Sequence, residues 1–270
     1  MLMSTEVIRK ANAGDQPALH RLWETVFGDP PDLVQAFYDR FPPEVSGWVL
    51  CQGGRICSAA YLIPGNWFVS PQEIMPAAYV YAVATDPEER KKGYAGRLMQ
   101  AIAAFAKERG LLLYTRPAER SLFPWYAEKL DADNIGFFQK RQFQVVSGHN
   151  ELPCHRMSPE EYGAARERHL AAIPHILLSD NFLRLQETYS DGYYAVGDGC
   201  CCVVKENDTL QIPELLAPEE QTAHCVQSLL AQFGMRKADV LTVGSASDEP
   251  GVAYNGTVRP IHTNWGFFLE

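Results

Sequence analysis

The strongest constraint on the fold is a change in hydrophobic periodicity between residues 78 and 114. The run Ala78–Ala84 is apolar without interruption, which is typical of a buried strand. Between Gly93 and Gly110 the apolar residues instead recur every three or four positions, at Ala95, Leu98, Met99, Ile102, Phe105 and Ala106. Leu111–Tyr114 then has the composition of another strand. The order strand, helix, strand predicts a unit of α/β type.

Strand and helix patterns also alternate on both sides of this unit. Patterns typical of strands occur at Glu6–Arg9, Trp48–Cys51, Ile56–Ile63 and Phe143–Val146. Patterns typical of helices occur at residues 15–27, 33–41 and 121–130. Gly53 and Gly54 suit a hairpin turn between two of the strands. We therefore expect an α/β (α+β) fold built on a mixed sheet.

The chain is long enough for two domains, because a typical domain has roughly 150 residues and this chain has 270. The proline-marked stretch Leu152–His155 separates the two halves, and Ser158 with Glu161 fits a capping box that starts a new helix. We expect domains at 1–153 and 154–270.

The second half repeats the first in a degenerate form. PELLAPEEQTAHCVQSLLAQFGMRKADVLTV, from Pro213, has the same order of strand, Pro-Glu-Glu, amphipathic helix, glycine and strand as the segment from Tyr81. Such duplication is considered before function is assigned, because only one copy needs to be active. After Pro218-Glu219-Glu220 the second copy has no glycine, so we expect no phosphate site there.

The net charge of −9 falls entirely in the second half. Residues 1–150 hold 16 basic and 16 acidic side chains, and residues 151–270 hold 8 and 17. This balance argues against binding to nucleic acid or to an anionic membrane, which both require a basic surface. No apolar signal core or membrane-length stretch occurs, and the seven cysteines form no disulfide or zinc pattern. We expect a cytoplasmic protein without a metal.

The segment Arg90–Gly96 has the composition of an anion-binding turn between a strand and a helix. Gly93 permits close approach of the backbone to a ligand, and the small Ala95 and Gly96 leave the first helical turn uncrowded. The free N–H groups of that turn and the three preceding basic residues favour a phosphate. The turn has neither the GxGxxG pattern nor the Lys-Ser/Thr ending of the common nucleotide motifs.

The spacing Arg-x-x-Gly-x-Ala at Arg90, Gly93 and Ala95 resembles the pyrophosphate signature of the GCN5-related N-acetyltransferases (GNAT), which use acetyl-CoA. The order of elements over about residues 5–146 is similar to that family too. The resemblance implies the acyl-CoA N-acyltransferase fold, and acetyl-CoA as co-substrate. It also implies that the strand supplies backbone groups to the pantetheine arm and the turn binds pyrophosphate. The implied cofactor-binding residues are Ala82, Val83, Thr85, Arg90, Lys91, Lys92, Gly93, Tyr94, Ala95 and Gly96.

The resemblance also assigns catalytic roles. Tyr126 matches the position of a tyrosine that protonates the thiolate of coenzyme A in many members. The strand before the turn lacks the carboxylate that some members use as base. Glu73, a water relay or a carboxylate of the second domain remain the candidates for that role. The family often has a Gly-Phe pair soon after the tyrosine, whereas Gly136-Phe137 arrives late, so we expect a remodelled end of the domain.

An active domain followed by a degenerate one is similar to the tandem arrangement in acetyltransferases related to enhanced intracellular survival proteins. The resemblance implies transfer of an acetyl group to a primary amine of a small molecule or a protein, by direct attack in a ternary complex. The acidic second half favours a cationic acceptor. The alternatives are a non-catalytic sensor of acyl-CoA and an enzyme that transfers another acyl or aminoacyl group. The oligomeric state is left unassigned.

Overall fold

The computed structural model describes residues 5–146, 152–256 and 263–266, which fold as two compact units. The first unit takes in residues 5–67, 74–135 and 252–256 of the described chain, and the second takes in 68–73, 136–146, 152–251 and 263–266. The units therefore differ from two contiguous halves that meet at residue 153. None of the described helices is long and apolar enough to cross a membrane.

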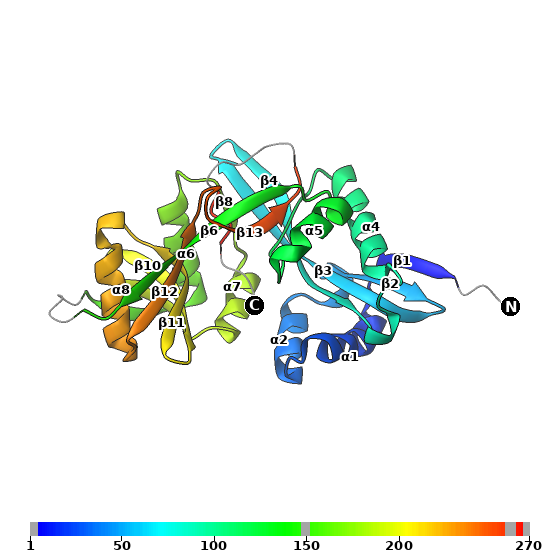
Figure 1. The fold of residues 1–270 in the computed structure, drawn as a ribbon, viewed down its shortest axis with the longest axis horizontal. Helices are drawn as coiled ribbons and strands as arrows, with labels where there is room; N and C mark the ends of the chain where they lie inside the picture. Colours follow the sequence, from blue (N-terminus) through cyan, green and yellow to red (C-terminus); the bar gives the residue numbers. More distant parts are fainter. Residues whose placement is uncertain (1–4, 147–151, 257–262, 267–270) are drawn as a thin grey trace. The chain divides into compact units, whose positions relative to one another are not determined.

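The first unit is a mixed sheet with helices on both faces (Figure 1). Its strand order is β1-β2-β3-β4-β5, in which β1–β2 and β2–β3 are antiparallel and β4–β5 is parallel. The strands are β1 (Glu6–Lys10), β2 (Gly47–Gln52), β3 (Arg55–Ser70), β4 (Glu73–Thr85) and β5 (Leu112–Thr115). The helices are α1 (Gln16–Phe27), α2 (Pro31–Arg40), α3 (Pro43–Ser46), α4 (Tyr94–Glu108) and α5 (Phe123–Leu130). The predicted βαβ unit is confirmed as β4, α4 and β5.

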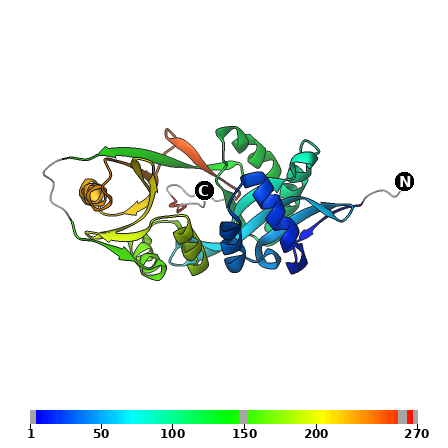
Figure 2. The same ribbon diagram turned by 90° about the horizontal axis from the view of Figure 1, so that it is seen from below.

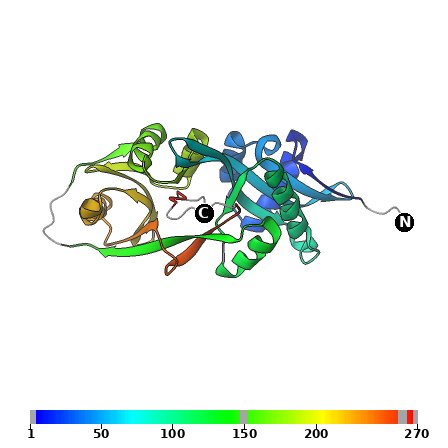
Figure 3. The same ribbon diagram turned by 90° about the horizontal axis from the view of Figure 1, so that it is seen from above.

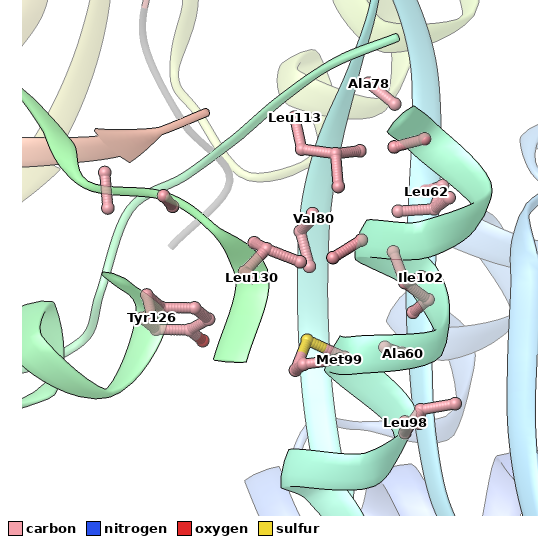
Figure 4. Packing of buried hydrophobic residues seen from close by; sticks show 14 of the residues in the cluster. Ala60, Leu62, Ala78, Val80, Leu98, Met99, Ile102, Leu113, Tyr126 and Leu130 are labelled. Atoms are coloured by element: carbon pink, nitrogen blue, oxygen red, sulfur yellow. The ribbon is translucent and has the colours of Figure 1, made fainter. Parts of the chain in front are cut away.

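Alternation along β3 and β4 sends neighbouring side chains to opposite faces of this sheet. On one face, side chains of α4 and α5 pack against β3, β4 and β5 (Figure 4). That cluster includes Leu62, Val80, Leu98, Met99, Ile102, Leu113, Tyr126 and Leu130. On the other face α1 and α2 form an aromatic cluster, in which the ring of Trp23 lies 5.2 Å from that of Tyr61 and 5.7 Å from that of Tyr81.

The second unit has the strand order β6-β12-β11-β10-β9-β7, and β11–β12 is parallel. The strands of this order are β6 (Asn134–Gln144), β7 (Cys154–Met157), β9 (Gly192–Val196), β10 (Gly199–Glu206), β11 (Thr209–Leu216) and β12 (Lys237–Val243). β8 (His175–Leu177) lies off this order, and β13 (Glu249–Tyr254) is divided between the units at Val252. The helices are α6 (Pro159–Leu170), α7 (Asp180–Thr188) and α8 (Glu219–Phe233). Figures 2 and 3 show α8 nearly end-on, with the strands of this unit curving around it.

The predicted second copy is confirmed as the βαβ unit of β11, α8 and β12. Its helix ends at Gly234 in the left-handed conformation, and its first turn contains Glu219 and Glu220. The capping box of Ser158 and Glu161 is confirmed at the start of α6. The chain thus contains two βαβ units of the same order, and the second has no glycine at the start of its helix. Cys200–Cys202 are buried, because helices cover both faces of β10.

Strand pairing explains the remodelled end of the first fold. The strand after α5, β6, pairs antiparallel with β12 over Phe138–Gln144, so most of it belongs to the second unit. The place beside β5 is taken instead by the end of β13, where Ala253 pairs with Thr115 and Tyr254 with Tyr114. The last strand of the first unit is therefore the end of β13, which lies more than 100 residues further along the chain than the rest of the unit.

Candidate active site

The turn between β4 and α4 presents free backbone N–H groups. Lys91 and Gly93 both have positive φ, 64° and 77°. Gly93 caps α4 without a side-chain hydrogen bond, and Arg97 N–H makes the first helical bond, to the carbonyl of Gly93 at 3.1 Å. The N–H groups of Tyr94, Ala95 and Gly96 thus have no partner within the helix. Because a helix N-terminus carries a partial positive charge, this turn suits a phosphate group.

The three basic residues of the turn have different surroundings. Lys92 Nζ lies 2.7 Å from a carboxylate oxygen of Glu89, which also bonds Arg55 and is nearly buried. Arg90 Nε lies 3.4 Å from the carbonyl of Thr85, and both Arg90 and Lys91 are exposed. Glu89 therefore offsets the charge of Lys92, and Arg90 and Lys91 are the better placed of the three to meet a phosphate.

The side chain of Arg97 links the turn between β4 and α4 to Glu6 of β1. Its guanidinium donates to both oxygens of Glu6, at 2.9 and 2.8 Å, and to the carbonyl of Lys92 at 3.1 Å. A side chain at Gly93 would place its Cβ 3.0 Å from Arg97 Nη1. A side chain at this position would therefore be strained by the positive φ and would displace this guanidinium by a few tenths of an ångström.

The structure adds a cation that the sequence analysis missed. Lys129, in α5, lays its aliphatic stem over the first turn of α4, and a Cβ at Gly96 would lie 3.4 Å from Lys129 Cε. The ammonium group pairs with the exposed Glu128 at 2.5 Å. Lys129 is therefore a further candidate for contact with an anion at this helix N-terminus.

We expect Lys129→Met to weaken binding of acetyl-CoA about tenfold, the size of one charged hydrogen bond at the lower end of its range. Methionine keeps most of the apolar stem over Gly96 and removes only the ammonium. Lys107→Met is the matched control, because Lys107 lies in the last turn of α4, at the opposite end of that helix from the proposed site. Calorimetric titration of both variants measures the effect, and equal affinities would exclude Lys129 from the site.

The edge of β4 is open where the resemblance places the pantetheine arm. β4 and β5 pair at Ala77, Ala78 and Tyr79, and in the described chain no register pair joins them beyond that point. Ala82 has a φ of 46°, which is uncommon for a residue with a Cβ and marks a local kink in the strand. The backbone around Ala82 and Val83 is thus placed to pair with an extended ligand.

Thr85 has a structural contact on its side chain. Its hydroxyl lies 3.0 Å from that of Ser58, which also donates to the carbonyl of Ala84 at 2.7 Å. These bonds hold the end of β4 against β3. Because its side chain is engaged, Thr85 is expected to contact acetyl-CoA through its backbone.

Tyr126 lies buried beside the point where β4 and β5 diverge. It lies beside Thr115, whose hydroxyl donates to the carbonyl of Val80 at 2.8 Å. Burial raises the pKa of Tyr126 above its ordinary value, and the neighbouring Thr115 offsets part of that rise. A protonated phenol at this position is suited to donate a proton.

The raised pKa gives an expectation for the pH dependence of turnover. A free tyrosine titrates near pH 10, so a buried one stays protonated up to a higher pH. If Tyr126 is the acid, the alkaline fall of kcat should lie above about pH 10. A kcat profile measured to that limit checks this, and a fall centred near pH 8 would identify a different acid.

Glu73, the predicted candidate base, lies apart from these residues along β4. It is the exposed first residue of the strand and groups with the second unit, whereas Tyr126 and the turn belong to the first. Its catalytic role stays a prediction. Trp67 and Tyr79 are buried core residues, while Tyr81 is half-buried in the aromatic cluster.

The residues present fit acetyl-CoA. An uncapped helix N-terminus, exposed basic side chains, an open strand edge and a buried phenol occur within one unit, in the order that a phosphate, an amide-rich arm and a thioester require.

Comparison with known proteins finds a similar domain and a similar fold. Residues 7–126 match the model of the acetyltransferase (GNAT) domain family. No protein of curated function matches the chain in sequence. The matched range begins in β1 and ends at Tyr126, so it contains β4, the turn, α4 and the candidate acid.

Solved structures share the fold over nearly the whole chain. A GCN5-related N-acetyltransferase from Kribbella flavida has a TM-score of 0.67 and 16% identity, covering 94% of this chain and 70% of that one. One from Anabaena variabilis has 0.72 and 13%, covering 93% and 71%. Eis1 from Mycobacterium abscessus has 0.67 and 14%, covering 93% and 73%. Residues 7–126 are therefore similar to the acetyltransferase (GNAT) domain, and the chain shares its fold with these GCN5-related N-acetyltransferases.

Proposed function

We propose that this protein is an acetyl-CoA-dependent N-acetyltransferase that transfers the acetyl group to a primary amine within a ternary complex. The proposal rests on one observation: the first unit contains an uncapped N-terminus of α4, an open edge of β4 and the buried phenol of Tyr126. The family match supports acetyl transfer in general.

Different residues of the first unit bind the cofactor and supply the proton. When bound, acetyl-CoA supplies an acyl group activated as a thioester. The N–H groups of Tyr94, Ala95 and Gly96, with Arg90 and Lys91, bind and orient the pyrophosphate. The backbone at Ala82 and Val83 aligns the pantetheine arm. Tyr126 Oη holds the proton that the departing thiolate needs, and Thr115 lies beside that phenol.

A cationic amine is the proposed acceptor class. The charge of residues 151–270 supports this, since those residues carry the whole excess of acid. The amine must lose a proton before or during attack. Glu73, a carboxylate of the second unit or water could accept it, and the proposal holds for any of these.

Mass spectrometry of amines incubated with the protein and acetyl-CoA tests the function. The panel contains a polyamine, an aminoglycoside and a lysine-containing peptide, with the protein omitted as control. We expect an acetylated product from at least one amine. Binding of acetyl-CoA without any product would favour the non-catalytic sensor, and products only with longer acyl-CoA donors would favour another acyl transferase.

A further inference from the structure

A nearly buried carboxylate stands directly before the anion-binding turn. Glu89 is 9% exposed and pairs with Lys92 Nζ at 2.7 Å and with Arg55. Asp86 pairs with the same arginine at 3.4 Å, so these four side chains together carry no net charge. The hydrogen bond to Glu89 raises the pKa of Lys92, which is therefore charged at neutral pH. Glu89 offsets the contribution of that charge to the turn.

A second carboxylate, on β1, neutralises Arg97. The guanidinium donates to both oxygens of Glu6, at 2.9 and 2.8 Å, and lies 5.0 Å from the centroid of the Tyr94 ring. The hydrogen bonds from Arg97 lower the pKa of Glu6, so this carboxylate is ionised at neutral pH. Two of the four cations between residues 90 and 97 thus have a carboxylate partner.

The other two cations, Arg90 and Lys91, are exposed and form no ion pair within the described part of the chain. Together with the partial charge at the start of α4 they present roughly 2.5 positive charges to a ligand. A diphosphate that bridges two organic groups carries roughly two negative charges, one on each phosphate. A nucleoside triphosphate carries about four, because its terminal phosphate ionises twice. The unpaired charge of the turn therefore balances a diphosphate diester but not a triphosphate.

We propose that Glu89 and Glu6 set the ligand specificity of this turn, favouring the diphosphate diester of acetyl-CoA over nucleoside triphosphates. The inference rests on the proposed function, because it assumes that the turn binds the pyrophosphate. Specificity of this kind comes from groups that repel the wrong ligand. Since electrostatic energy is proportional to the product of the charges, each carboxylate repels a ligand of four charges about twice as strongly as a ligand of two.

Calorimetric titration with two adenosine ligands, without magnesium, tests this inference. Dephospho-CoA carries its charges only on the diphosphate bridge, ATP carries a triphosphate, and neither has the 3′-phosphate of coenzyme A. Glu89→Gln and Glu6→Gln each remove one negative charge and keep the size of the side chain. In each variant, a gain of about threefold in affinity for dephospho-CoA should accompany a gain of about ninefold for ATP.

Glu44→Gln is the matched control, because it makes the same change at an exposed glutamate of α3. Both affinities should stay unchanged in this variant. Glu6 is exposed, so Glu6→Gln decides the test alone where loss of the nearly buried Glu89 prevents folding.

Titration of the natural chain with acetyl-CoA separates the two ways in which the account can fail. No binding of acetyl-CoA would contradict the proposed function and, with it, this inference. If acetyl-CoA binds, equal gains for ATP and dephospho-CoA in the variants would overturn the inference alone and leave the proposed function standing. No measurable gain for ATP, or the same gain in Glu44→Gln, would overturn it as well.

Discussion

Replacing Tyr126 by phenylalanine is expected to lower kcat by about 100-fold or more, the usual effect of losing a general acid. The ring keeps its packing against the cluster of α4 and β4, and only the hydroxyl beside Thr115 is removed. The KM for acetyl-CoA should change by less than about twofold, because the missing proton transfer acts in the transition state. Steady-state kinetics with an amine that the protein acetylates measures both constants.

Tyr194→Phe is the control for this prediction. Tyr194 is a half-buried tyrosine of the second unit, so its variant removes a hydroxyl without touching the candidate site. An unchanged kcat in Tyr126→Phe would show that the phenol only fills space. A matching loss in Tyr194→Phe would show that the assay reports a general effect of such substitutions.

Replacing Gly93 by glutamate should weaken binding of acetyl-CoA by at least about 100-fold. The new carboxylate would stand where the pyrophosphate is proposed to bind, and two like charges about 4 Å apart near a protein surface repel by roughly 4 kcal/mol. Each 1.4 kcal/mol is about a factor of ten in affinity. Calorimetric titration with acetyl-CoA measures the change directly.

The matched control is Gly28→Glu. Gly28 ends α1 with a φ of 76°, almost the φ of 77° at Gly93, so both glutamates carry the same backbone strain of about 1 to 2 kcal/mol. Nothing lies within 4 Å of a Cβ at Gly28. Both variants should therefore lose stability through the same backbone strain, Gly93→Glu also displaces the Arg97 guanidinium that lies 3.0 Å from the new Cβ, and only Gly93→Glu should lose the ligand. Equal loss of affinity in both variants would show that the loss comes from reduced stability and not from repulsion of the ligand.

The predictable parts of this molecule are those that local sequence determines. The βαβ unit follows from a change of hydrophobic period within about 40 residues, and the anion turn follows from Gly93 and its basic neighbours. Its second copy was recognisable for the same reason, since β11, α8 and β12 are consecutive. Within the turn, the pairing of Lys92 with Glu89 depends on three-dimensional approach, and the sequence analysis did not anticipate it.

The parts that were missed depend on contacts between distant segments. The unit boundaries differ from residue 153 because β6 pairs with β12 and the end of β13 pairs with β5. Lys129 reaches the α4 N-terminus only because α5 packs on α4. Glu214 would have been assigned to the wrong face by simple alternation, because a bulge in β11 reverses the pattern. Neither hydrophobic period nor residue spacing contains this information.

The stoichiometry of acetyl-CoA binding tests the central claim most directly. Titration of the natural chain in a calorimeter should give one site per chain, since the turn at Gly93 offers free N–H groups whereas α8 begins with Glu219 and Glu220. Saturation should also stabilise the protein, by about 2.7 kcal/mol at a ligand concentration 100 times the Kd. No binding would contradict the assignment of the turn, and two equal sites would contradict the degeneracy of the second fold.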